Sequence, residues 1–176
     1  IKINHRLYEI PTPQYYALFF NQGQHPALKD KFIRSILARA TNRSEIIENV
    51  LAGEAAPVFG PLPKGTPGYD ESALVDASST LPLTAASSTE LTTLLAKQGW
   101  VPTSDGVRAK AVGKSTVRLE FEIATPDVPL LTKTAELIKD QWQSVGIRAV
   151  IKTIPMSEIQ QTTIKPRAYQ VLLFGN

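Results

Sequence analysis

A strand, a helix and a second strand follow one another closely between residues 115 and 154, and this order constrains the fold most. The segment STVRLEFEIAT alternates apolar with charged residues, as expected of a strand with one buried and one wet face. Pro129 opens a helix that ends at Gly146, and IRAVIKTI follows at once as another strand. The apolar helix positions are Leu131, Ala135, Ile138 and Trp142. This order predicts an α/β domain with a mixed sheet flanked by helices.

Two further strands are predicted near the ends of the chain. The runs YYALFFN, residues 15–21, and YQVLLFGN, residues 169–176, are almost continuously apolar and aromatic. Such runs are typical of strands covered on both faces. We therefore expect both to lie within the sheet.

A pair of helices is predicted after the first strand. Asp30 is the expected N-cap of a helix with an apolar stripe, and Asn42 begins a second helix with Glu45 in capping-box spacing. Gly53 ends that second helix. The first stripe consists of Phe32, Ile33, Ile36, Leu37 and Ala40. The bases Lys31, Arg34 and Arg39 fall outside it in different directions, so they are expected to surround a buried helix face.

The middle of the chain contains two loops. Residues 57–68 are rich in Pro and Gly, and residues 72–89 are rich in Ser and Thr without apolar periodicity. A helix restarts with Ser87 and Glu90 in capping-box spacing and stops at Gly99. These loops interrupt a chain that we expect to form a single domain.

Composition limits the classes of function. With 176 residues, 43% of them hydrophobic, the chain is long enough for one buried core. Lys and Arg number 19 against 16 Asp and Glu, an excess too small to indicate nucleic-acid binding. The absence of Cys excludes disulfides, thiolate nucleophiles and sulfur-based zinc sites. No apolar run approaches the roughly 18 residues needed to cross a bilayer.

The motifs of common catalytic and metal sites do not fit. His5 and His25 lie far apart in the sequence and lack ligand-type neighbours, so we expect no metal. GPLPKGT, residues 60–66, has its Lys before the second Gly and two prolines that remove backbone donors, which argues against a phosphate loop. No G-x-S-x-G elbow is present. Glu120 and Glu122 share the wet face of a strand, where no neighbour distinguishes either as a general acid or base. These observations favour a binding or structural module without a cofactor, and no enzyme.

The ordered set of segments resembles the C-terminal lobe of family 5 extracellular solute-binding proteins, the oligopeptide- and dipeptide-binding subunits of ABC importers. The first part of the resemblance is an aromatic strand ending in Asn21, then Pro26, Asp30, Arg34 and EIIENVLAG after Arg43. The second part is LLAKQGW, DGVR, LEFEIAT, AELIKDQWQSVGIRAVI and YQVLLFGN. Together they extend over most of the chain. In two places the sequence departs from the family pattern, with Asn42 where Asp is usual and Asn176 where Trp is common.

The resemblance implies one lobe of a two-lobed periplasmic-binding-protein-like fold of type II, cluster C. Residues 1–176 would be a single lobe excised between the two hinge crossings. Solute, most simply a peptide, would bind between this lobe and a missing second one. The expected ligand-binding residues lie at strand ends or after the Pro/Gly loop: Tyr15, Tyr16, Asn21, Tyr69, Gly175 and Asn176.

The same resemblance implies further properties of the full-length protein. It would act outside the cytoplasm, in the periplasm or at the cell surface with a lipid anchor, as a monomer that delivers solute to an ABC permease. No nucleic acid is expected as a partner. The alternative is a sensor or protein-interaction module in a regulatory protein, which a flanking helix-turn-helix would distinguish from transport.

Overall fold

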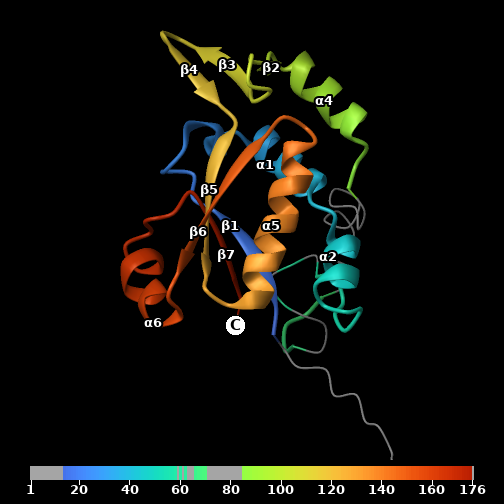
Figure 1. The fold of residues 1–176 in the computed structure, drawn as a ribbon, viewed down its shortest axis with the longest axis vertical. Coiled ribbons are helices and arrows are strands. Elements are labelled where there is room, and N and C mark those ends of the chain that lie inside the picture. The colour runs from blue at the N-terminus through green and yellow to red at the C-terminus, as the bar shows by residue number, and fades with distance from the viewer. Residues whose placement is uncertain (1–13, 59, 61, 63–65, 71–84, 176) are drawn as a thin grey trace, which may run out of the picture.

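The computed structural model describes residues 14–58, 60, 62, 66–70 and 85–175 (Figure 1). Its strands are β1 (Tyr16–Phe20), β2 (Val101–Pro102), β3 (Arg108–Val112), β4 (Ser115–Arg118), β5 (Glu120–Pro126), β6 (Arg148–Ile154) and β7 (Val171–Gly175). Its helices are η1 (Pro26–Lys29), α1 (Lys31–Ala40), α2 (Arg43–Asn49), α4 (Ser88–Lys97), α5 (Pro129–Gln143), α6 (Met156–Ile159) and η3 (Gln160–Ile164).

The main sheet has four strands in the order β1-β7-β5-β6. Strand β5 runs parallel to both β6 and β7, whereas β1 is antiparallel to β7. The prediction of a mixed sheet flanked by helices is therefore confirmed. The first and last strands are neighbours within this sheet.

A second sheet of three short antiparallel strands, in the order β2-β3-β4, is joined to the main sheet through Leu119. The Leu119 N–H donates to the carbonyl of Arg108 in β3 at 2.8 Å, and the Leu119 carbonyl accepts from the N–H of Arg148 in β6 at 2.9 Å. The prediction of one continuous strand through STVRLEFEIAT is wrong, because Leu119 divides it between two sheets. The apolar alternation continues across the break and does not reveal it.

The main core lies on the face of the sheet covered by α1 and α5 (Figure 1). Phe121 of β5 meets Trp142 of α5 edge to face, with ring centroids 6.2 Å apart. The Trp142 indole N–H donates to the hydroxyl of Thr41 at 3.0 Å, so this fully buried side chain has its polar group satisfied. The predicted inward positions of α5 are all buried. On the other face, α6 and η3 cover a smaller cluster of Ala124, Ile154, Ile159 and Leu172.

The predicted helix caps differ in outcome. The Asp30 carboxylate accepts from the N–H of Phe32 at 2.8 Å, and the Asn42 side chain accepts from the N–H of Glu45 at 3.2 Å, which confirms both N-caps. At the start of α2, the backbone N–H of Asn42 donates to the side-chain oxygen of Gln141 of α5 at 3.0 Å. In a complete capping box this N–H would donate to the side chain of Glu45.

The capping box predicted at the start of α4 is wrong. Ser87 is the N-cap residue by position, but its side chain makes no capping hydrogen bond. Glu90 instead forms an ion pair with Arg39 of α1. The base Arg39 thus joins two helices, and α4 begins at Ser88, where the sequence predicts that a helix restarts.

Strand β1 lies at an edge of the main sheet. The side chains of Tyr16 and Phe19 are 47% and 41% exposed, on opposite faces of the strand. The prediction that this apolar run is covered on both faces is therefore wrong. Its aromatic residues lie at a surface, where they are accessible to a ligand.

Candidate functional site

The carboxyl ends of β5, β6 and β7 meet at one edge of the main sheet, here called the carboxyl edge (Figure 1). Strands that run parallel bring their last residues to the same side, and ligands of open α/β sheets gather there. The turns that lead into α5 and α6 leave from this edge. It is the candidate functional site of the described chain.

Three of the predicted site residues meet at the carboxyl edge. Tyr16, at the start of β1, pairs in register with Gly175 at the end of β7. A Cβ atom placed on Gly175 would lie 2.1 Å from Cδ1 of Tyr16 and 2.6 Å from the carbonyl oxygen of Tyr15. The Tyr16 ring therefore occupies the space that a side chain at 175 would need. Gly175 allows an aromatic ring to lie directly on the backbone at the strand end.

Asn21 lies at the opposite edge of the sheet, because β1 is antiparallel to β7. Its backbone N–H donates to the carbonyl of Gln170 at 2.8 Å, and its side-chain amide donates to the carbonyl of Arg167 at 2.9 Å. The Asn21 side-chain oxygen also accepts from the N–H of Gly23 at 3.0 Å. These bonds order the entry to β7. The structure thus separates Asn21 from Tyr16 and Gly175.

The two other predicted residues are not placed at this edge. Tyr69 is half-buried and its backbone N–H donates to the carbonyl of Thr66 at 3.0 Å. No hydrogen bond or ring contact within the described ranges joins it to the strand ends. Asn176 lies outside the described residues. Ligand binding by all six residues stays a prediction.

Asp127 and Met156 belong to the carboxyl edge, and sequence reasoning missed both. The backbone N–H of Asp127 donates to the carbonyl of Ile154, and its carboxylate accepts from the N–H of Met156, each at 2.9 Å. Asp127 therefore ties the end of β5 to the start of α6. The Met156 side chain is 52% exposed. The signal for Asp127 was its place directly after a buried strand, in the TPDVP segment.

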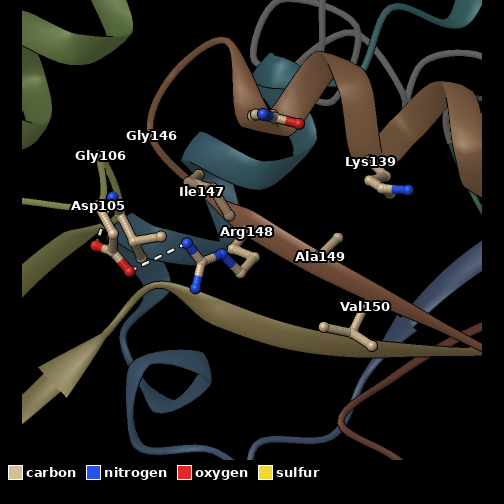
Figure 2. A pocket seen from close by; sticks show the side chains of 10 residues that line it. Asp105, Gly106, Lys139, Gly146, Ile147, Arg148, Ala149 and Val150 are labelled. Atoms are coloured by element: carbon tan, nitrogen blue, oxygen red, sulfur yellow. Dashed lines mark hydrogen bonds and ion pairs between the residues drawn. The ribbon is translucent and has the colours of Figure 1, made fainter.

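A pocket of about 410 Å³ lies at the other end of β6, between this strand, α5 and the turn that joins β2 to β3 (Figure 2). Gly106 and Gly146 close one end. A Cβ on Gly146 would lie 3.0 Å from Cγ of Arg108 and 3.2 Å from the carbonyl oxygen of Gly106, and the φ of Gly146 is +81°. This approach of two loops is possible because residue 146 is glycine.

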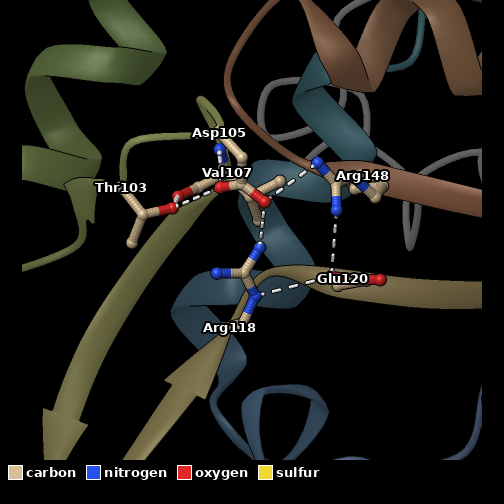
Figure 3. Close-up of polar contacts among 6 residues, drawn as sticks. All are labelled: Thr103, Asp105, Val107, Arg118, Glu120 and Arg148. Atoms are coloured by element: carbon tan, nitrogen blue, oxygen red, sulfur yellow. Dashed lines mark hydrogen bonds and ion pairs between the residues drawn. The ribbon is translucent and has the colours of Figure 1, made fainter.

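A network of ion pairs connects the two sheets beside this pocket (Figure 3). The Asp105 carboxylate accepts from the guanidinium of Arg118 at 2.7 Å and from that of Arg148 at 3.0 Å. Glu120 lies 3.5 Å from Arg118 and 3.6 Å from Arg148. Hydrogen bonds from the Thr103 hydroxyl and from Arg118 hold the pKa of Asp105 well below its usual range. The network is exposed and links β4, β5 and β6 with the β2–β3 turn, so its role is to hold the sheets together.

His25 contributes to packing beside the main sheet. It is half-buried: its Nδ1 accepts from the N–H of Ala27 at 3.2 Å, and its ring lies 4.7 Å from that of Phe121. Burial lowers its pKa, so the neutral ring is favoured. His5 lies outside the described residues. The described ranges contain no group of three or more residues that could hold a metal ion.

Three parallel strands flanked by helices, with an aromatic strand added at one edge, define one lobe of a periplasmic-binding-protein-like fold. The chain belongs to the bacterial extracellular solute-binding proteins, family 5 Middle, whose model matches residues 1–176. No curated protein sequence matches it significantly. None of the described helices has the length and apolar character that crossing a membrane requires.

Solved structures share the fold at low sequence identity. The oligopeptide-binding protein AppA from Bacillus subtilis, in complex with a nonapeptide, is 22% identical with a TM-score of 0.78, over 93% of this chain and 31% of that one. An oligopeptide-binding protein from Thermus thermophilus, complexed with a pentapeptide, is 18% identical with a TM-score of 0.77, over 93% of this chain and 28% of that one. NikZ from Campylobacter jejuni, in complex with Ni(L-His), is 22% identical with a TM-score of 0.69, over 92% of this chain and 29% of that one. The chain therefore spans less than a third of the length of each.

Proposed function

We propose that the chain is one lobe of a substrate-binding protein that captures solute for an ABC importer, and that the carboxyl edge is its wall of the solute cleft. The family match over residues 1–176 carries this proposal. The carboxyl edge supports it, because an exposed aromatic ring lies there on bare backbone at Gly175. In this proposal residues 1–176 form a single lobe. A second lobe supplies the opposite wall, and the two close on the solute.

The proposed solute is a peptide. A peptide offers backbone donors and acceptors to the strand end at Gly175, and apolar side chains to Tyr16 and Met156, both about half exposed. The two oligopeptide-binding relatives hold a nonapeptide and a pentapeptide, whereas NikZ holds a nickel–histidine complex. The family thus takes solutes of different chemistry, and peptide capture by this chain is the specific hypothesis. The protein would act outside the cytoplasm as a monomer and deliver the peptide to a permease without catalysing a reaction.

The test uses the full-length protein that carries this chain. Native mass spectrometry of the purified protein would reveal co-purified solute, and calorimetry with mixed tripeptides to pentapeptides would measure affinity. We expect a Kd of about 1 μM or lower, a free energy near −8 kcal/mol. Tyr16→Ala should weaken binding, whereas Thr162→Ala, on the surface of η3, should not. A protein that binds no peptide, or that binds equally well without the Tyr16 ring, would contradict the proposal.

A further inference from the structure

The outer edge of β6 has backbone groups that pair with nothing in the sheet. On the inner side of β6, the Arg148 N–H donates to the carbonyl of Leu119, just before β5, and the Ile154 carbonyl accepts from the N–H of Asp127, just after β5. Because the direction of backbone groups alternates along a strand, the even-numbered residues of β6 bond to β5. The N–H and C=O groups of Ala149, Ile151 and Thr153 therefore point away from the sheet. β6 is the last strand in the order β1-β7-β5-β6.

The pocket of about 410 Å³ runs along part of this edge as a groove between β6 and α5 (Figure 2). Lys139 and Gln143 of α5 form its helical side. Ala149 forms its strand side, whereas the side chain of Val150, 52% exposed, is on the other face of β6 with Arg148 and Lys152, at the rim of the pocket. An edge strand beside a helix is the arrangement in which an added strand can pair with backbone on one side and insert side chains into a groove.

The charged residues around the groove are already neutralised. Lys139 lies 2.9 Å from Glu136 on the same helix, and Arg148 is paired with Asp105. Lys152 of β6 lies 3.4 Å from Glu122. Since Ala149 and Ile151 pack toward the α5 side, Arg148 and Lys152 point to the opposite face of the sheet and pair with β5 there. They do not project along the edge as the charged residues that protect edge strands usually do.

We propose that the outer edge of β6 and the groove between β6 and α5 form a docking surface for an extended, uncharged peptide segment of a partner protein, which adds a fifth strand to the main sheet. The backbone of the segment would pair with Ala149, Ile151 and Thr153. One of its apolar side chains would enter the groove beside Ala149. The mutual neutralisation of the lining charges favours an uncharged segment. This surface is separate from the carboxyl edge and does not depend on solute capture.

The experiment uses the full-length protein and a fluorescein-labelled peptide of alternating valine and threonine, N-methylated at every second residue. This probe has one free strand edge and cannot stack on itself. The same peptide N-methylated at every residue serves as the control without N–H groups. Fluorescence anisotropy measures binding, and hydrogen exchange read by mass spectrometry follows the amides of residues 147–155.

We expect binding of the single-edge probe, slower exchange of the Ala149, Ile151 and Thr153 amides, and at least tenfold weaker binding of the fully methylated control. Thr153→Pro removes one outward N–H at an edge position where proline is tolerated, and should weaken binding about fivefold. Thr153→Val keeps that N–H and should bind like the parent protein. Thermal unfolding of both variants shows whether the fold is retained, and the methylated control tests the pairing without any substitution.

Three results would overturn the proposal. Slow exchange of these amides in the absence of the probe would mean that another part of the same protein covers the edge. Protection that rises with protein concentration would identify a second copy as the occupant. Unchanged anisotropy with freely exchanging amides would show that the edge accepts no strand.

Discussion

Replacing Gly175 by alanine tests the close approach of two strands at the carboxyl edge. The new Cβ would lie 2.1 Å from Cδ1 and 2.7 Å from Cε1 of Tyr16, and 2.6 Å from the carbonyl oxygen of Tyr15. Contacts this short cannot persist, so the Tyr16 ring must leave its position and the end of β1 must shift. The ring can move because it is 47% exposed, whereas the backbone of Tyr15 yields less easily.

The expected loss follows from overpacking. Forcing extra volume into a packed contact costs about 1–3 kcal/mol, and we expect the free energy of unfolding to fall by about 2 kcal/mol. For a unit of about 150–250 residues that unfolds by itself, such a loss lowers Tm by about 4–8 °C. Tyr16→Ala alone removes a half-exposed ring and should cost about 1 kcal/mol. In the double variant the ring clash is absent, so its loss should be smaller than the sum of the two single losses by at least about 1 kcal/mol.

The assay is urea unfolding of the full-length protein and its three variants, followed by circular dichroism. Gly23→Ala is the matched control. The φ of Gly23 is not positive, and a Cβ added there would have the Asn21 side-chain oxygen as its nearest neighbour, at 3.4 Å. This control should change stability by less than about 0.5 kcal/mol. Equal stability of Gly175→Ala and the parent, or strict additivity with Tyr16→Ala, would refute the proposed contact.

Three other predictions concern the core, the ion pairs and the lobe itself. Thr41→Val removes the acceptor of the Trp142 indole N–H and should cost about 1–3 kcal/mol in thermal unfolding. Thr116→Val, at an exposed position of β4, should change stability by less than about 0.5 kcal/mol, and similar Tm values for the two variants would contradict this prediction. The pKa of Asp105 is lowered in the folded state, so the contribution of this carboxylate to the free energy of unfolding is complete above about pH 4 and is lost as pH falls further. Asp105→Asn should therefore reduce the loss of stability at acid pH. An unchanged dependence of stability on pH in this range would contradict the network. Residues 1–176 alone should bind peptide at least about 100-fold more weakly than the full-length protein in calorimetry, because a cleft needs both walls, and equal affinities would contradict a shared site.

The sequence predicts elements well where a single strong pattern decides them. The helix opened by Pro129 buries all four of its predicted inward positions, and Asp30 and Asn42 cap their helices as expected. Both terminal strands lie in the main sheet, as their apolar runs predicted. The contact between Tyr16 and Gly175 follows from their register, which no pattern along the chain specifies.

Other features depend on which strands become neighbours, and the sequence carries no direct signal for that. An apolar run such as residues 15–21 does not distinguish a central strand from an edge strand, so the exposure of Tyr16 and Phe19 was not foreseen. Asn21 and Gly175 both end strands, but the antiparallel pairing of those strands places them at opposite edges. Ser87 has the spacing of a capping box, yet its expected partner Glu90 pairs with Arg39 because α1 lies beside α4.

Leu119 couples the two sheets of the lobe rigidly. Its N–H is held by one sheet and its carbonyl by the other, at 2.8 and 2.9 Å, with no flexible linker between them. The three-stranded sheet cannot swing as a separate flap unless both bonds break and the Asp105 network opens with them. If the chain closes on solute as proposed, both sheets should therefore move together as one rigid body, and the bending should occur outside them, where the proposed second lobe is joined.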